Sequence, residues 1–61
     1  MVVWKGEMSK DNHTIFFDVK EDTVDITETF NDDVMQPVEV SIKDAISRQE
    51  TLERLGYEFT R

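Results

Sequence analysis

The fold is decided by the stretch TIFFDVKEDTVDITETF, residues 14–30. Apolar residues hold alternate positions in both of its halves: Ile15, Phe17 and Val19, then Val24, Ile26 and Phe30. Alternation with a period of two, in segments rich in β-branched and aromatic residues, indicates half-buried antiparallel strands. The dipeptide Glu21-Asp22 lies between the two halves and predicts a tight turn. The stretch is therefore predicted to form a β-hairpin.

A turn at Glu21-Asp22 sets the pairing on both faces of this hairpin. The predicted partners are Val19 with Val24 and Phe17 with Ile26 on the core side, and Phe16 with Thr27 and Asp18 with Asp25 on the other face. Like charges directly opposite each other destabilise a sheet by some tenths of a kcal/mol. A small protein that keeps Asp18 opposite Asp25 invites the hypothesis that this face binds a partner. The alternative is an ordinary solvated face with one exposed aromatic residue.

Shorter signals flank the hairpin on both sides. A strand is predicted from Val2 to about Met8, and Trp4 is expected to complete the core of so small a domain. Residues 31–33 break the alternating pattern, and residues 38–40 are consistent with a short edge strand after Pro37. Alternation in residues 57–60 predicts a last strand.

A helix is predicted from residue 42 onward. Ser41 suits the N-cap position, with Asp44 three residues later, and Gly56 suits the left-handed position after the C-terminus. The expected core stripe comprises Ile42, Ala45, Ile46, Gln49 and Leu52. The outer face carries two i,i+4 charge pairs, Asp44–Arg48 and Glu50–Arg54. Residues 1–61 thus predict a single α+β domain with the order βββαβ, in which one amphipathic helix packs on one face of a small antiparallel sheet.

The composition narrows the classes of function. The chain of 61 residues carries 14 acidic and 7 basic residues, a formal net charge of −7, and no cysteine. Disulfides and thiolate metal sites are excluded, and so much negative charge argues against binding nucleic acid or an anionic membrane directly. Basic proteins are the expected partners. The N-terminal residues resemble neither a signal peptide nor a membrane span, so the expected location is the cytoplasm.

Acidic residues also gather along the sequence between residues 18 and 33. They are Asp18, Glu21, Asp22, Asp25, Glu28, Asp32 and Asp33, and only Lys20 opposes them. Spaced carboxylates on a rigid small fold can imitate the phosphates of a duplex and occupy a nucleic-acid groove on another protein. A solvated surface is the alternative interpretation of such a charge run.

Signals for catalysis or cofactor binding are weak. The single histidine, His13, is expected to be a solvated residue of the first turn, and the two glycines are isolated, so no phosphate-binding loop is predicted. The carboxylates lack the spacing of a calcium loop. Glu28 lies on the apolar side of its strand, where it either marks the end of the core or pairs with Arg48 or Arg54. No enzyme activity, metal or cofactor is predicted.

The last half of the chain contains a segment that resembles a known family. The segment from Val38 through the helix start SIKDA to the ending GYEFTR, residues 56–61, is similar to small phage-encoded inhibitors of host RNA polymerase. The resemblance implies a compact viral or mobile-element protein that blocks a host nucleic-acid enzyme. It assigns no functional residue to this chain.

These observations predict a small inhibitor or modulator, monomeric or weakly dimeric, that docks on a basic surface of a larger protein. The residues expected to bind this partner are Phe16, Asp18, Glu21, Asp22 and Asp25, with Asp32 and Asp33 as supporting charge. Substituting Asp18 and Asp25 by Asn is expected to weaken binding and leave stability equal or improved. The alternative is a structural or accessory subunit that assembles through a sheet edge or apolar contact.

Overall fold

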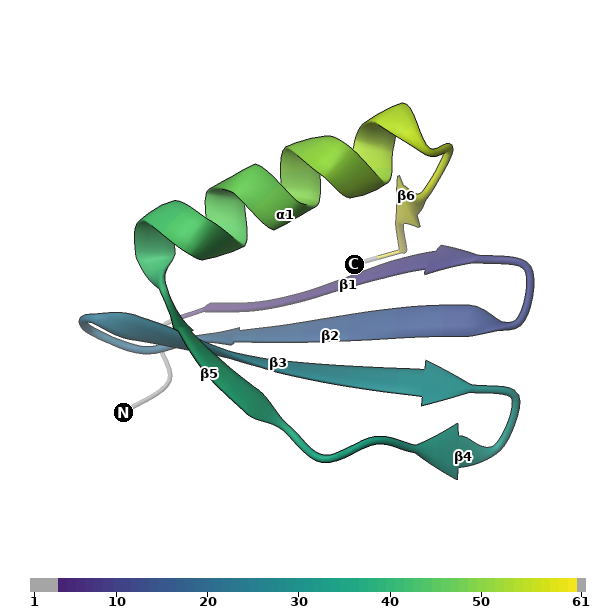
Figure 1. Cartoon of the computed structure of the whole chain (residues 1–61), viewed down its shortest axis with the longest axis horizontal. Helices are drawn as coiled ribbons and strands as arrows, with labels where there is room; N and C mark the ends of the chain where they lie inside the picture. The colour runs from purple at the N-terminus through teal and green to yellow at the C-terminus, as the bar shows by residue number, and fades with distance from the viewer. Residues whose placement is uncertain (1–3, 61) are drawn as a thin grey trace.

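The computed structural model describes residues 4–60 and shows an antiparallel sheet with one helix across one face (Figure 1). The elements are β1 (Trp4–Lys10), β2 (His13–Val19), β3 (Thr23–Phe30), β4 (Asp33–Val34), β5 (Val38–Ser41), α1 (Ile42–Arg54) and β6 (Glu58–Phe59). The predicted α+β class and its βββαβ order are confirmed, with β4 as an additional short strand. Val2 and Val3 lie outside the described residues. In the described part, no helix has the length and apolar character needed to cross a membrane.

The sheet is a meander extended at both sides. Its strand order is β4-β3-β2-β1-β6, and β5 also pairs with β3. The predicted hairpin register is confirmed, with Phe17 opposite Ile26 and Asp18 opposite Asp25. At the far side, β6 pairs with β1 through Met8 and Phe59, which joins the two ends of the chain. The register therefore places Phe16, Asp18 and Asp25 on one face of the sheet, as the position of the turn predicts.

Two hairpin turns lie side by side at one end of the sheet. The β1–β2 loop begins at Asp11 with φ 54°, and the β3–β4 loop begins at Asn31 with φ 56°. Asp and Asn tolerate this left-handed conformation better than other side chains. The Asn31 amide donates to the Asn12 carbonyl at 2.8 Å and joins the two turns. The expected break at residues 31–33 corresponds to this turn, after which Asp33 begins β4.

Both ends of α1 follow the sequence signals. The Ser41 hydroxyl accepts from the Asp44 amide at 3.1 Å, as predicted for an N-cap. Gly56 has φ 98°, and the amides of Gly56 and Tyr57 donate to the carbonyls of Glu53 and Leu52. This pair of hydrogen bonds is a Schellman motif. The helix is thus fixed in length by its own caps.

The core is small and belongs mostly to the sheet. Its buried residues are Met8, Ile15, Phe17, Val24, Ile26 and Ala45, with Val19, Val40, Leu52 and Tyr57 packed against them. The predicted helix stripe is only partly correct, since Ile42 and Ile46 are exposed and Ala45 alone is buried. Trp4 is 45% exposed and does not complete the core; its indole lies over Gly6, where a Cβ atom would meet the ring.

Candidate functional site

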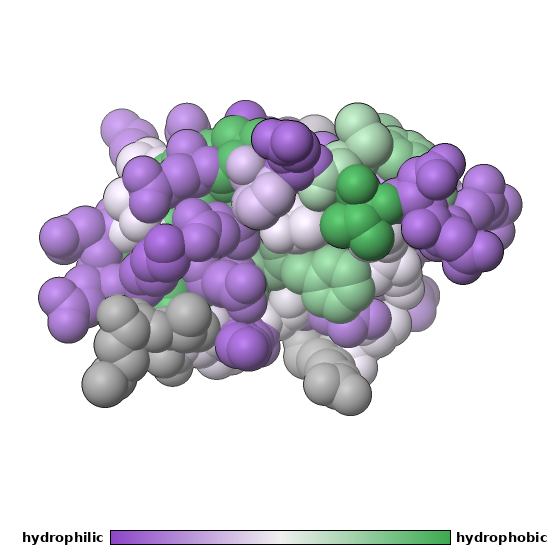
Figure 2. Space-filling model, turned by 90° about the horizontal axis from the view of Figure 1, so that it is seen from below, coloured by the Kyte–Doolittle hydropathy of each residue, from purple (hydrophilic) through white to green (hydrophobic). Residues whose placement is uncertain are grey.

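The sheet face opposite the helix carries Phe16, Asp18 and Asp25 of the predicted partner-binding residues. We call this surface the acidic face and define it by Phe16, Asp18, Asp25 and Glu39, together with the turn residues Glu21 and Asp22 at its end. Figure 2 views the molecule from the side away from α1, where hydrophilic side chains gather at the left and a hydrophobic patch lies right of centre. By register, the exposed apolar residues on this face are Phe16 and Val34. Charge and apolar surface thus lie next to each other.

Positive charges moderate the repulsion on this face. In the strand register, Lys5 on β1 lies opposite Asp18. Glu39 on β5 lies opposite Asp25 and adds a further negative charge. Lys20 Nζ lies 2.8 Å from Asp25 Oδ2 and 3.9 Å from Glu39 Oε2. Asp25 therefore has an ionic partner, whereas Asp18 has none within 4.0 Å among the described residues. The expectation of equal or improved stability therefore applies to the substitution of Asp18, because substitution of Asp25 also removes its contact with Lys20.

The hydrogen bond and charge of Asp25 raise the pKa of Lys20 above its ordinary value, with Glu39 and Asp18 adding smaller effects. A raised pKa means that the folded state holds the Lys20 proton more tightly than the unfolded chain. This stabilisation is complete below the ordinary lysine pKa and disappears as the pH rises through the folded-state pKa. We expect an NMR titration of the Lys20 side chain to show this raised pKa, and Asp25→Asn to bring it back toward the ordinary value. An unchanged titration in Asp25→Asn would contradict the contact.

The structure separates the predicted residues into two groups. Glu21 and Asp22 lie exposed in the β2–β3 turn, close in sequence and in register to Asp18 and Asp25. Asp32 and Asp33 lie beyond the other end of β3, which spans eight residues. Each strand residue advances the chain by about 3.4 Å, so roughly 25 Å separates the two ends. The run of acidic residues in the sequence is therefore two clusters in space.

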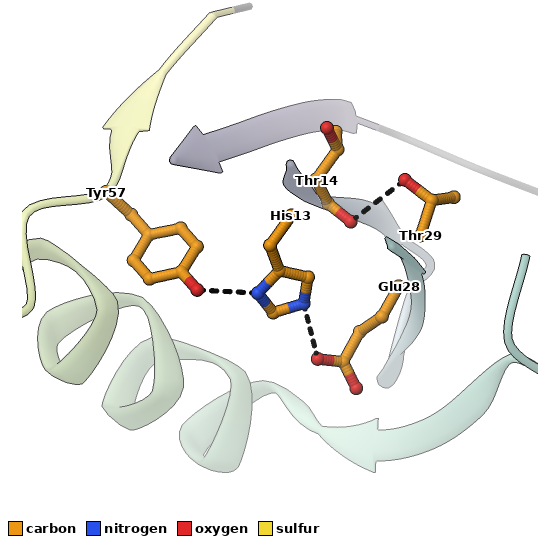
Figure 3. Close-up of polar contacts among 5 residues, drawn as sticks. All are labelled: His13, Thr14, Glu28, Thr29 and Tyr57. Carbon is orange, nitrogen blue, oxygen red and sulfur yellow. Dashed lines mark hydrogen bonds and ion pairs between the residues drawn. The ribbon is translucent and has the colours of Figure 1, made fainter. Parts of the chain in front are cut away.

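A second polar arrangement lies on the helix side and was missed by the sequence analysis. His13 Nδ1 lies 2.5 Å from the Tyr57 hydroxyl, and His13 Nε2 lies 3.0 Å from Glu28 Oε1 (Figure 3). The imidazole stacks on Phe30 with a centroid distance of 4.1 Å and meets Tyr57 edge to face. Its side chain is 16% exposed. These contacts tie β2, β3 and the segment after α1 together.

The donors and acceptors in this arrangement match in either protonation state of His13. An ionised Glu28 only accepts, so Nε2 carries a proton and donates to it. In the neutral ring Nδ1 accepts the Tyr57 hydroxyl proton, and in the charged ring Nδ1 donates to the Tyr57 oxygen. The prediction that His13 is a solvated turn residue is wrong, because it begins β2 on the same side as Ile15. Glu28 pairs with this histidine and makes no ion pair with Arg48 or Arg54.

The described residues offer no group of three or more His, Asp or Glu side chains placed to hold a metal ion. The i,i+4 pairs predicted on α1 are also not formed, since Asp44–Arg48 and Glu50–Arg54 make no ion pair within 4.0 Å there. The described residues thus present two features, the acidic face and the hydrogen-bonded His13 on the helix side of the sheet.

Comparison of the chain with protein-family models, with curated proteins and with solved structures finds no match. The resemblance to phage-encoded polymerase inhibitors therefore stays a prediction.

Proposed function

We propose that the protein is a non-catalytic binding module whose acidic face docks on a basic surface of a larger protein. The observation that carries this proposal is the position of Asp18 opposite Asp25 beside Phe16, on the sheet face that the helix leaves uncovered. Five carboxylates gather at this end, from Asp18, Glu21, Asp22, Asp25 and Glu39, against the ammonium groups of Lys5 and Lys20. The excess negative charge would steer a cationic partner toward this face.

Phe16 supplies the apolar contact that charge alone lacks. Aromatic residues near the centre of an interface often contribute more binding energy than the charges at its rim. Phe16 lies between Glu7 on β1 and Thr27 on β3, beside a shallow hollow that Lys5 and Asp18 also line. A partner that handles nucleic acid would meet spaced carboxylates where it ordinarily meets phosphates. Occlusion of its groove is the simplest inhibitory mechanism.

The proposal is tested with charge variants matched in number but placed on different faces. Asp18→Asn, Glu21→Gln and Asp22→Asn together remove three charges from the acidic face. Glu50→Gln, Glu53→Gln and Asp11→Asn remove the same number from α1 and the β1–β2 turn. A tagged pull-down from a nuclease-treated lysate, eluted with a salt step, should recover one dominant basic partner with the wild type and the second variant. The first variant should bind that partner at least about tenfold more weakly, since several charge pairs are lost.

Equal losses from both variants would show that overall charge, and not this face, drives binding. A partner retained at 1 M salt, where the Debye length is about 3 Å, would favour the alternative of an accessory subunit. One observation supports that alternative. β6 pairs with β1 only at Met8 and Ser9, so within the described residues Trp4 to Gly6 have no strand on their outer side. Strand addition at this edge would persist in high salt.

A further inference from the structure

A cavity of about 260 Å³ lies between α1 and the β3 side of the sheet. It exists because the helix presents polar residues to this part of the sheet. At about 100° per residue, Asp44, Arg48 and Thr51 fall on one side of α1, and Ile42 and Ile46 fall on the other. The polar side chains stay at the rim and leave the space above the sheet unfilled.

The floor of this cavity is apolar and firmly held. Ile15, Phe17 and Ile26 line it, and their exposures are 3%, 0% and 5%. Each projects from the centre of a long strand and belongs to the core, so the floor is preformed. An enclosed apolar cavity of roughly 150 Å³ holds benzene, and this space is larger but open to solvent on one side. The space therefore suits an aromatic or branched aliphatic group with a short tail.

The rim carries more negative than positive charge. Glu28 and Asp44 contribute carboxylates and Arg48 a guanidinium, and none of these groups makes an ion pair with another within 4.0 Å. Glu28 accepts from His13 through Oε1, and its side chain is 43% exposed. That hydrogen bond orients the carboxylate beside the apolar floor. A net charge of −7 on the whole chain adds to the attraction for a cation.

We propose that this cavity binds small amphipathic ammonium compounds, with an apolar ring on the floor and the cationic group near Glu28. The site lies on the helix side of the sheet, opposite the acidic face, and does not depend on the proposed partner. Because the floor residues expose little surface, removal of the ring's own apolar surface from water provides most of the affinity, and the carboxylates choose the sign of the charge.

The probe is 2-phenylethylammonium, titrated into ¹⁵N-labelled protein to millimolar concentration and followed by amide chemical shifts. We expect the largest shifts at Ile26, Glu28, Arg48 and Thr51. The carboxylate with the same phenylethyl group, 3-phenylpropionate, should bind at least roughly fivefold more weakly. Shifts confined to the acidic face, equal binding of the two probes, or no shift at all would each overturn the proposal.

Three variants assign any binding to this cavity. Glu28→Gln keeps an oxygen that can accept from His13 but removes the charge, so the ammonium probe should bind roughly two- to fivefold more weakly. Glu50→Gln removes one charge from the outer side of α1 and should leave binding unchanged. Thr51→Leu places a larger apolar side chain at the rim and should abolish the shifts in a folded protein. Equal weakening by Glu28→Gln and Glu50→Gln, or normal binding by Thr51→Leu, would refute the assignment.

Discussion

Phe17→Ala is expected to lower the free energy of unfolding by about 3–5 kcal/mol. Phe17 has 0% exposure and lies at the centre of β2, where Gly6 and Ile26 flank it on the neighbouring strands. Truncating a buried phenylalanine to alanine costs about 3–5 kcal/mol. A domain of this size has a total stability of roughly 3–9 kcal/mol, at 0.05–0.15 kcal/mol per residue. The loss therefore removes between about a third and all of that stability, and urea denaturation followed by circular dichroism measures it.

The adjacent residue provides a matched control. Phe16 has the same side chain on the same strand but points to the acidic face and is 36% exposed. Phe16→Ala should therefore lower the free energy of unfolding by less than about 1 kcal/mol. Similar losses for the two variants would show that β2 does not present these residues to opposite sides of the sheet.

The second large effect is expected at His13. Replacing it by alanine removes the hydrogen bonds to Tyr57 and Glu28 and the stacked contact with Phe30. A hydrogen bond contributes about 1 kcal/mol, more when one partner is charged, and an aromatic pair adds roughly 0.5–1.5 kcal/mol. We expect His13→Ala to lower the free energy of unfolding by about 2–3 kcal/mol, measured by urea denaturation at neutral pH.

Two more conservative variants separate the contributions at this position. His13→Phe keeps a stacked ring and loses both hydrogen bonds, so it should show about two thirds of the loss. Tyr57→Phe removes a single hydroxyl and should cost about 1 kcal/mol. In the double variant His13→Ala and Tyr57→Phe, the losses should be less than additive because the two side chains share a bond. Full additivity would mean that the Tyr57 contact contributes nothing.

The parts of the fold that could be predicted are those controlled by neighbouring residues. Alternation in residues 14–30 predicts both strands, and a symmetric loop centred on Glu21-Asp22 forces Asp18 opposite Asp25. Ser41 and Gly56 mark the helix ends because caps depend on backbone groups a few residues away. The pairing on the acidic face was therefore accessible from sequence.

The errors concern contacts between distant segments. His13 meets Glu28 across 15 residues and Tyr57 across 44, and no local pattern connects them. The clues were its position two residues before Ile15 and the placement of Glu28 on an apolar side. Helical periodicity predicts the stripe that contains Ile46. In the structure only Ala45 of α1 is buried against the sheet, and Ile46 stays exposed. The sequence places Asp32 and Asp33 in one acidic run with Asp18, but the length of β3 separates them in the folded protein.

The unequal pairing of β1 has a consequence for the order in which the protein folds. β1, β2 and β3 join through short turns, so their contacts close small loops and form early. Pairing of Met8 with Phe59 closes a loop of most of the chain for a two-residue ladder. We therefore expect β6 to pair with β1 last during folding and to separate from it first during unfolding. This separation also breaks the contact between Tyr57 and His13. Amide hydrogens bonded between β1 and β6 should exchange with solvent through this partial opening. Those bonded between β2 and β3 should exchange only through global unfolding.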